Sequence, residues 1–133
     1  MAYIEFRDVV KRFGDNTVLD HINFGIEKGD LVTLLGPSGC GKSTLLRCLS
    51  GLEQVTEGTI ILDGEDITNV PASKRNIGMV FQQYSLFPNM TVAQNICVVP
   101  TLLKYGKEEC DRIARQLLEM VNLPYEQYAH KYP

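Results

Sequence analysis

A glycine-rich loop between an apolar run and a predicted helix constrains the fold of this chain more than any other feature. The stretch reads LVTLLGPSGCGKSTLLRCLSGL over residues 31–52 and contains the pattern G-x-x-x-x-G-K-S. We expect a buried strand over Leu31 to Leu35 and a helix over about Lys42 to Leu52, with the glycines between them free to take positive φ. A turn that only reverses the chain does not need this many glycines together with a proline and a lysine. Strand, loop and helix in this order are typical of a phosphate-binding loop.

The residue types in the loop suit a nucleotide phosphate chain. Backbone N–H groups of the turn, and those left unpaired where the helix begins, favour an anion. Lys42 reaches the β- and γ-phosphates, Ser43 offers a hydroxyl to Mg²⁺, and Thr44 brings a second hydroxyl towards the α-phosphate. The alternative is an ordinary strand-to-helix turn with a helix-capping serine. The residues predicted to bind the nucleotide here are Gly36, Pro37, Ser38, Gly39, Cys40, Gly41, Lys42, Ser43 and Thr44.

Composition excludes several classes of protein. A chain of 133 residues is long enough for one domain with a core. The net charge of −3, with both signs interspersed, gives no basic footprint for nucleic acid. No apolar run approaches the roughly 18 residues of a membrane span, and the first residues lack a signal-peptide core. We therefore expect a cytoplasmic chain without a transmembrane segment of its own.

The four cysteines do not form a metal-binding pattern. None of Cys40, Cys48, Cys97 and Cys110 belongs to a C-x-x-C pair, so we expect free thiols. Cys40 differs because it lies in the loop at a helix N-terminus, where a thiolate is favoured. We interpret it as a small residue that fills a loop position and whose reactivity serves as a probe.

Periodicity predicts the remaining elements. Alternating apolar residues favour strands in residues 3–13 and 21–30, and a β-branched run that ends in Asp63-Gly64 predicts a hairpin. Another strand is expected over Ile77 to Phe81. Thr91 is a candidate cap for a helix over about Val92 to Val99. These elements indicate an α/β core followed by a helical segment.

A third helix is predicted in KEECDRIARQLLEMVNL, over residues 107–123. Its apolar residues recur at helical spacing, with Ile113, Leu117, Met120 and Val121 on one side.

Over nearly its whole length, the sequence resembles the ATP-binding subunit of an ATP-binding-cassette transporter of the importer type. The run LLGPSGCGKSTLLRCLSGLEQVTEGTIILDG resembles the phosphate loop and hairpin of that family, and RNIGMVFQQYSLFPNMTVAQNI resembles its glutamine loop. The resemblance implies a P-loop NTPase core with an N-terminal antiparallel β-subdomain over about residues 1–83. The glutamine loop and the start of a helical subdomain would occupy about residues 84–133.

The resemblance also implies site residues and partners. Phe13 would stack on adenine with Val18 beside it, and Gln82 would touch Mg²⁺ and sense the γ-phosphate, although Gln83 leaves a register ambiguity. The segment Tyr84 to Val92, with apolar residues such as Leu86 and Phe87, would contact a membrane-spanning permease subunit. ATP and Mg²⁺ are the implied cofactors. A second copy of the chain would complete the ATP sites, at the inner face of the cell membrane.

Acidic residues near the hairpin offer a competing metal site. The run TIILDGED ends in Asp63 as magnesium-binding strands do, and Glu65 or Asp66 would then be the catalytic carboxylate. The Asp63-Gly64 turn favours a hairpin instead, as the family resemblance also implies.

The 133 residues lack three elements that the resemblance places further along the chain: an LSGGQ-type signature, an apolar strand ending in Asp-Glu, and a switch histidine. His21 and His130 are interpreted as surface or packing residues. We therefore expect a truncated chain that binds ATP weakly and hydrolyses it poorly or not at all. The missing core strands would also leave an exposed sheet edge.

Three functions remain open from sequence. The first is an ATPase that drives solute import, with a weak resemblance to importers of osmoprotectants, other quaternary amines or amino acids. The second is a soluble, non-transport ATPase of the same group, and the third is a module that binds nucleotide without turnover. Nothing in the chain reads the solute.

Overall fold

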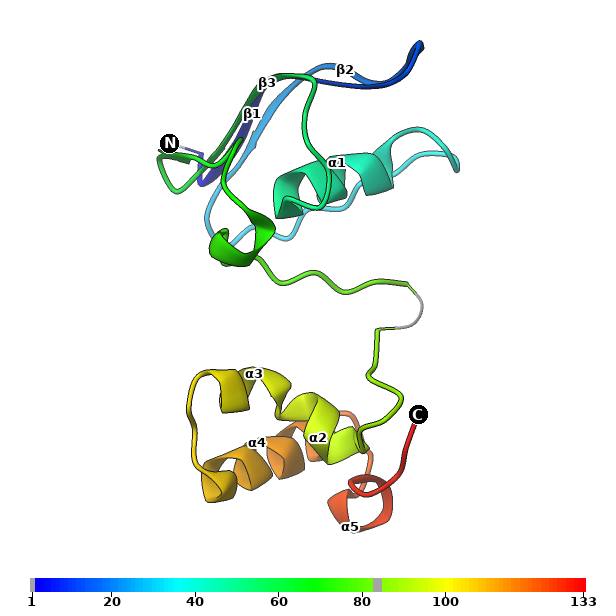
Figure 1. Ribbon diagram of the computed structural model, residues 1–133, viewed down its shortest axis with the longest axis vertical. Helices are drawn as coiled ribbons and strands as arrows, with labels where there is room; N and C mark the ends of the chain where they lie inside the picture. The colour runs from blue at the N-terminus through cyan, green and yellow to red at the C-terminus, as the bar shows by residue number, and fades with distance from the viewer. Residues whose placement is uncertain (1, 83–84) are drawn as a thin grey trace. The chain divides into compact units, whose positions relative to one another are not determined.

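An antiparallel sheet and one helix form the first of two units into which the chain divides. The computed structural model describes residues 2–82 and 85–133, and its two compact units comprise residues 1–79 and 80–133 (Figure 1). In the first unit, β1 (Ile4–Phe13) pairs with β2 (Asn16–Ile26) and β3 (Glu57–Leu62), and β4 (Glu65–Asp66) completes the order β2-β1-β3-β4. The strands predicted from alternation in this part of the chain are confirmed.

Two tight turns explain how these strands connect. Gly14 takes φ 60° between β1 and β2, a conformation that glycine reaches without a Cβ clash. Between β3 and β4, Asp63 at φ 51° and Gly64 at φ 82° are both left-handed, as a type I′ hairpin requires. The hairpin predicted from the Asp63-Gly64 pair is therefore confirmed.

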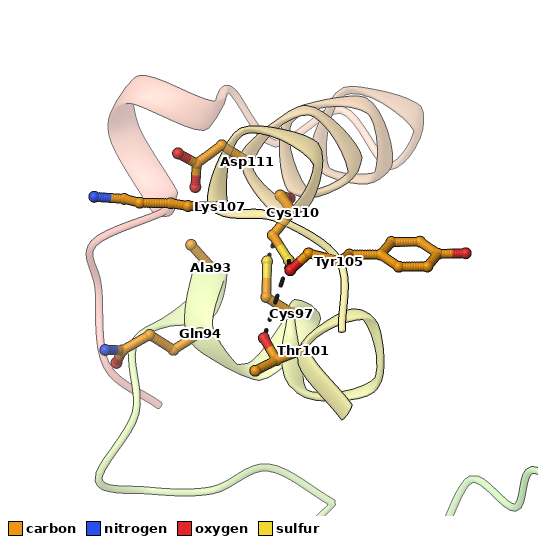
Figure 2. A pocket seen from close by; sticks show the side chains of 8 residues that line it. All are labelled: Ala93, Gln94, Cys97, Thr101, Tyr105, Lys107, Cys110 and Asp111. Atoms are coloured by element: carbon orange, nitrogen blue, oxygen red, sulfur yellow. Dashed lines mark hydrogen bonds between the residues drawn. The ribbon is translucent and has the colours of Figure 1, made fainter. Parts of the chain in front are cut away.

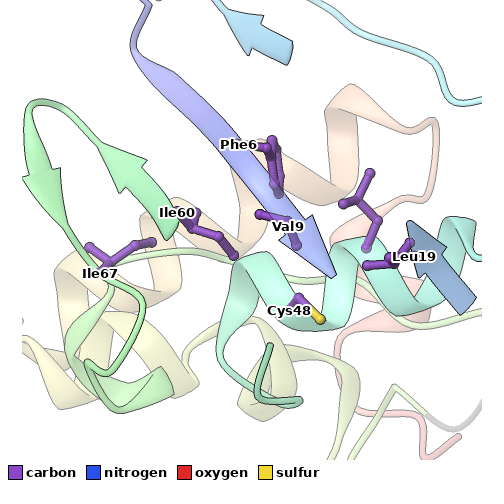
Figure 3. Packing of buried hydrophobic residues seen from close by; sticks show 7 residues of the cluster. Phe6, Val9, Leu19, Cys48, Ile60 and Ile67 are labelled. Atoms are coloured by element: carbon purple, nitrogen blue, oxygen red, sulfur yellow. The ribbon is translucent and has the colours of Figure 1, made fainter. Parts of the chain in front are cut away.

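The core of the first unit lies between the sheet and α1 (Lys42–Ser50). Phe6, Val9 and Ile60 come from the sheet, and Cys48 meets them from α1 (Figure 3). Burial of these side chains removes apolar surface from water and is the main stabilising contribution to the unit. The helix ends at Gly51, whose φ of 87° makes it a left-handed C-cap, so α1 is slightly shorter than the predicted helix.

A bulge in β1 brings two backbones unusually close together. Asp8 takes φ 53° where the register of β1 against β3 shifts, and Gly58 of β3 lies opposite at φ 94°. A Cβ on Gly58 would lie 2.4 Å from the carbonyl oxygen of Asp8. Asn23 of β2 fixes the bulge, because its Oδ1 accepts a hydrogen bond of 2.9 Å from the Asp8 N–H. Its side chain also lowers the pKa of Asp8 by hydrogen bonding to the carboxylate.

Arg75 joins the end of α1 to the segment after the hairpin, which includes the 3-10 turn η1 (Ala72–Lys74). The residue is 5 % exposed, and its guanidinium donates to four carbonyl oxygens at 2.8–3.1 Å. Those acceptors belong to Val70, Cys48, Leu49 and Thr68. Two of them lie at the C-terminus of α1, where the helix dipole favours a cation. Burial lowers the pKa of Arg75.

Two predicted strands are wrong. Residues 31–35 and 77–81 form no strand, and within residues 2–82 and 85–133 neither pairs with a neighbour. Leu31 is 96 % exposed and Val80 is 91 % exposed, whereas Leu34 and Ile77 pack partly on the core of the first unit. The reason is that an extended segment needs a ladder partner for its N–H and C=O groups, and none is supplied by the described residues.

Helices make up the second unit: α2 (Val92–Ile96), α3 (Val98–Leu102), α4 (Lys107–Met120) and α5 (Tyr125–Tyr128). Thr91 caps α2 in a capping box with Gln94, as its position predicted. The single helix expected over residues 92–99 is wrong, because it breaks at Cys97. Pro100 explains the break, since it has no N–H for the carbonyl of Ile96 and its ring crowds that carbonyl.

The predicted helix over residues 107–123 forms as α4, but the apolar side named from the sequence is not the side that is buried. Cys110, Ala114 and Leu118 are buried, at spacings of four residues. Ile113 is half-buried, but Leu117, Met120 and Val121 are exposed in the structure. Helical periodicity offers two adjacent apolar stripes here, and packing against α2 selects the stripe with the smaller side chains. No helix formed by residues 2–82 or 85–133 has the length and apolar character needed to cross a bilayer.

Substitution of Gly58 tests the close approach at the bulge. We expect Gly58→Ala to lower the free energy of unfolding by about 3 kcal/mol or more, because it combines backbone strain with a clash against Asp8. Gly64→Ala is the matched control: it has positive φ and open space, so strain alone costs about 1 kcal/mol. Urea unfolding followed by circular dichroism measures both. Equal losses would contradict the close approach.

Substitution of Arg75 tests the polar contacts at the end of α1. Arg75→Met keeps most of the side-chain volume but leaves four carbonyl oxygens without this donor, so we expect a loss of about 3 kcal/mol. Arg75→Lys retains the charge with fewer directed donors and should lose less. Exposed Arg12 is the control, and Arg12→Met should change the urea midpoint little. A tolerated Arg75→Met would show that the carbonyl contacts are not stabilising.

Candidate functional site

The predicted phosphate loop enters α1 through two left-handed glycines. Gly39 takes φ 83° and Gly41 takes φ 97°, and the Cys40 N–H bonds to the Pro37 carbonyl at 3.3 Å. Gly41 is the N-cap of α1, and no side chain caps this helix end. The N–H groups of the first turn of α1 therefore have no side-chain acceptor, and they remain suited to an anion.

Lys42 folds back onto the loop that precedes it. Its ammonium donates to the carbonyl oxygens of Gly36 and Pro37, the latter at 2.8 Å, and lies 3.4 Å from the sulfur of Cys40. A Cβ on Gly36 would lie 2.7 Å from that sulfur, so a larger residue at this position would have to displace the Cys40 side chain. The ammonium charge is thus held inside the turn, among the residues predicted to meet phosphate.

Strand β2 supports the exit of the loop. A Cβ on Gly41 would lie 3.0 Å from the carbonyl oxygen of Val18 and 3.3 Å from its Cγ1. A side chain at Gly41 would therefore collide with β2 as well as strain the backbone. The structure brings Val18, predicted from the family resemblance, next to the end of the loop.

Phe13 ends β1, at the hairpin that leads into β2. Its side chain is 46 % exposed, and the ammonium of Lys11 lies 5.0 Å from the ring centroid. Lys11 itself is paired with Glu53 at 3.2 Å. The ring is accessible and lies beside a fixed positive charge. Sequence reasoning missed Lys11, whose only signal was its place two residues before the aromatic.

Gln82 lies in the second unit and is exposed, so the structure does not bring it into the unit that carries the loop, Phe13 and Val18. Gln83, the alternative register, and Tyr84, the start of the predicted permease contact, lie outside the described residues.

Asn95 organises the rest of the predicted permease contact. Its Oδ1 accepts the Phe87 N–H at 2.8 Å, and its Nδ2 donates to the carbonyls of Phe87, Met90 and Thr91 at 3.0–3.2 Å. Leu86 and Phe87 are more than half exposed, beside a cavity of about 210 Å³. Sequence reasoning missed Asn95. An asparagine four residues after a helix cap was the available signal.

The acidic residues of the hairpin serve the turn. The Asp63 N–H donates to the Tyr3 carbonyl at 2.7 Å, and Oδ1 of Asp66 accepts the N–H and hydroxyl of Thr68 at 2.9 and 2.6 Å. These bonds lower the pKa of Asp66. Residues 2–82 and 85–133 contain no group of three histidine, cysteine or acidic residues able to hold a metal ion. The competing metal site therefore has no support from this geometry.

Neither histidine is held as a buried polar group. His21 is exposed and its Nδ1 lies 3.2 Å from Oδ1 of Asp8, at the bulge of β1. His130 is exposed and lies edge-on to the ring of Tyr125 at 6.2 Å.

Comparison with known proteins gives a consistent family. The model of the ABC transporter family matches residues 19–132. The spermidine/putrescine import ATP-binding protein PotA of Haemophilus influenzae (strain 86-028NP) is 51 % identical over 120 residues, which cover 90 % of this chain and 32 % of that protein. The Fe(3+) ions import ATP-binding protein FbpC of Escherichia coli O157:H7 is 48 % identical over 121 residues, or 91 % of this chain and 35 % of that protein.

A solved structure agrees in fold. The ATP-binding cassette MJ0796, solved as a dimer in a post-hydrolysis state with ADP and Pi, matches with a TM-score of 0.81 and 31 % identity. The match covers 96 % of this chain and 61 % of that one. The chain thus spans about a third of the length of the curated relatives described here. On the family model and these identities, the chain belongs to the ABC transporter family.

Proposed function

We propose that this chain is the nucleotide-binding part of an ATP-driven importer. The observation that carries the proposal is the loop from Gly36 to Gly41, which enters α1 with its helix end uncapped and encloses the ammonium of Lys42. Relatives whose names describe import ATP-binding proteins support the same reading.

The donors of the loop fit Mg²⁺ and a triphosphate. Lys42 would exchange its carbonyl partners for β- and γ-phosphate oxygens, which are stronger acceptors because they are charged. Ser43 would supply a hydroxyl to Mg²⁺, and Thr44 would bind the α-phosphate. When bound, Mg²⁺ neutralises developing charge between the β- and γ-phosphates.

Residues outside the loop complete the proposed site. Phe13 would stack on adenine, and its exposed ring leaves room for this. Val18 would pack beside the base, next to the loop exit that it already supports. Gln82 would reach Mg²⁺ and sense the γ-phosphate.

Hydrolysis needs groups that these 133 residues do not contain. The sequence has no LSGGQ-type element and no apolar strand ending in Asp-Glu, and the Asp66 carboxylate accepts hydrogen bonds from Thr68. Positioning of water and Mg²⁺ in phosphoryl transfer depends on such groups. We propose that this chain by itself binds ATP weakly without appreciable turnover, and that hydrolysis belongs to the longer proteins of the family.

The proposed partners are a membrane-spanning permease and a second copy of the chain. The segment of residues 84–92 would contact the permease through Leu86 and Phe87, held in place by Asn95. The dimeric state of the matching cassette structure supports pairing of two copies. The chain would then lie at the inner face of the cell membrane without spanning it.

The solute is not encoded in the proposed site. The named relatives import different cargo, polyamines in one case and ferric ions in the other, at nearly the same identity to this chain. Solute choice therefore belongs to the permease side.

Removal of Lys42 tests nucleotide binding. ATP should slow alkylation of exposed Cys40 by N-ethylmaleimide in the parent chain, and Lys42→Ala should weaken this protection about tenfold in ATP concentration. Because Lys42 also lies near the Cys40 sulfur, each variant is compared with itself, with and without ATP. Lys28→Ala removes the same charge from a lysine beside Tyr3 and should leave protection unchanged. Equal protection in Lys42→Ala would contradict the proposed site.

A phosphate-release assay on the same proteins tests the absence of turnover. We expect release indistinguishable from the Lys42→Ala background, because the water-positioning groups are missing from the sequence. Lys42-dependent release would overturn this part of the proposal and return Asp63 and Glu65 as catalytic candidates.

Substitution of Phe13 tests adenine stacking separately from phosphate binding. Phe13→Ala should weaken ATP binding about two- to tenfold, the range expected for one aromatic pair, and leave inorganic tripolyphosphate binding unchanged. Phe13→Tyr keeps the ring and should retain ATP affinity. A parallel loss for both ligands would show that Phe13 acts by supporting the fold, not by stacking.

A further inference from the structure

Two cysteines of the second unit meet at one cavity. Cys97 lies at the break between α2 and α3, and Cys110 lies in α4. Both line a cavity of about 340 Å³ within that unit, together with Thr101, Tyr105, Lys107 and Asp111 (Figure 2). Neither thiol has a role in the proposed nucleotide site.

The contacts bring the two sulfurs together. The Cys97 thiol donates to the carbonyl oxygen of Cys110 at 3.3 Å. The Cys110 sulfur lies 4.0 Å from Thr101 Oγ1 and from the Tyr105 carbonyl oxygen. Figure 2 shows the two sulfurs pointing towards each other.

The surroundings of the pair suit a covalent link. Cys110 is 6 % exposed and Cys97 is half-buried, so the pair has one accessible and one protected sulfur. Cys97 lies where the α2–α3 path is interrupted, which allows its backbone to adjust by the small amount that an S–S bond requires. Cys110 is fixed by the packing of α4, with Ala114 buried next to it on the same face.

We propose that Cys97 and Cys110 form a redox-active dithiol that closes to a disulfide with a low-molecular-weight disulfide as oxidant. The link would tie the α2–α3 break to α4. It would also close a loop around α3, constraining the unfolded chain more than the reduced pair does.

The disulfide forms by thiol–disulfide exchange in two steps. The thiolate of Cys97, the more accessible sulfur, attacks one sulfur of the oxidant R–S–S–R, forms a mixed disulfide and expels one R–S⁻. The sulfur of Cys110 loses its proton, attacks the Cys97 sulfur and expels the second R–S⁻. The two protein thiols lose two electrons and two protons in total, and the oxidant becomes two R–SH.

The surroundings of Cys97 set the pH dependence of its attack on the oxidant. Burial and the neighbouring Cys110 thiol raise the pKa of Cys97 to about 11. Asp111 also raises the pKa of Cys97. Lys107 and Tyr105 are the other titratable groups at the cavity. From α2 and α3, the cavity is lined by the uncharged side chains of Gln94 and Thr101. The thiolate fraction rises about tenfold per pH unit below the pKa, so closure should accelerate about tenfold between pH 7 and 8 and again between pH 8 and 9.

Peptide mapping of the oxidised full chain tests the proposal. The protein is equilibrated with a reduced and oxidised glutathione buffer, quenched with acid and digested with trypsin. Cleavage after Arg75, Lys104, Lys107 and Arg112 puts Cys97 in peptide 76–104 and Cys110 in peptide 108–112. We expect one linked product whose mass is the sum of the two peptides minus two hydrogens.

Variants distinguish the pair from unspecific oxidation. Cys97→Ser and Cys110→Ser should each abolish the linked product, whereas Cys48→Ala should leave it intact. Exposed Cys40, in peptide 29–42, reports that the oxidant is active. The parent chain alone decides the question if a variant does not fold. Free or separately glutathionylated Cys97 and Cys110, under conditions that fully modify Cys40, would overturn the proposal.

Discussion

The buried guanidinium of Arg75 is the contact on which the arrangement of the first unit depends. It holds carbonyls at the end of α1 together with carbonyls of the segment after the hairpin, without a carboxylate partner. A buried cation in this position is tolerable because each carbonyl it meets is an acceptor and the helix C-terminus adds a favourable dipole. Gly51 complements it, since a Cβ there would lie 2.9 Å from the Arg75 Nε. With the end of α1 fixed in this way, the start of the same helix has a defined place against β2.

The loop site therefore inherits its geometry from both ends of α1. At the far end Arg75 anchors the helix, and at the near end Gly41 sits against the backbone of Val18. The second unit has a similar arrangement, because the Asn95 side chain hydrogen bonds to backbone groups of Phe87, Met90 and Thr91 in the segment that leads into α2. In each unit one polar side chain satisfies main-chain groups of an irregular segment, which would otherwise carry a desolvation cost.

The features that sequence predicted are those fixed by neighbouring residues. Asp63-Gly64 needs only its own φ angles to form the hairpin, and Thr91 caps α2 with Gln94 three residues away. Residues 31–35 and 77–81 were predicted wrongly because a strand requires a partner whose identity its own sequence does not contain. The buried side of α4 also depends on packing, since its sequence offers two adjacent apolar stripes and only one of them is buried. Arg75 and Asn95 were missed because their partners are backbone groups, which have no signature in the sequence.

The difference between segments fixed by their neighbours and segments that need a distant partner also affects how strongly the loop can bind a ligand. Its exit is fixed by α1 and β2, whereas its entry, residues 31–35, has no ladder, and Leu31 and Leu35 are at least 90 % exposed. Ordering the backbone costs about 1–2 kcal/mol per residue, and a ligand that needs an ordered entry must supply that free energy from its own contacts. The proposed phosphate-binding loop can therefore have a fixed exit and still bind its ligand weakly, as proposed above. An additional strand paired with residues 31–35 would raise affinity without touching the nucleotide, because the ordering cost would already be met in the folded protein.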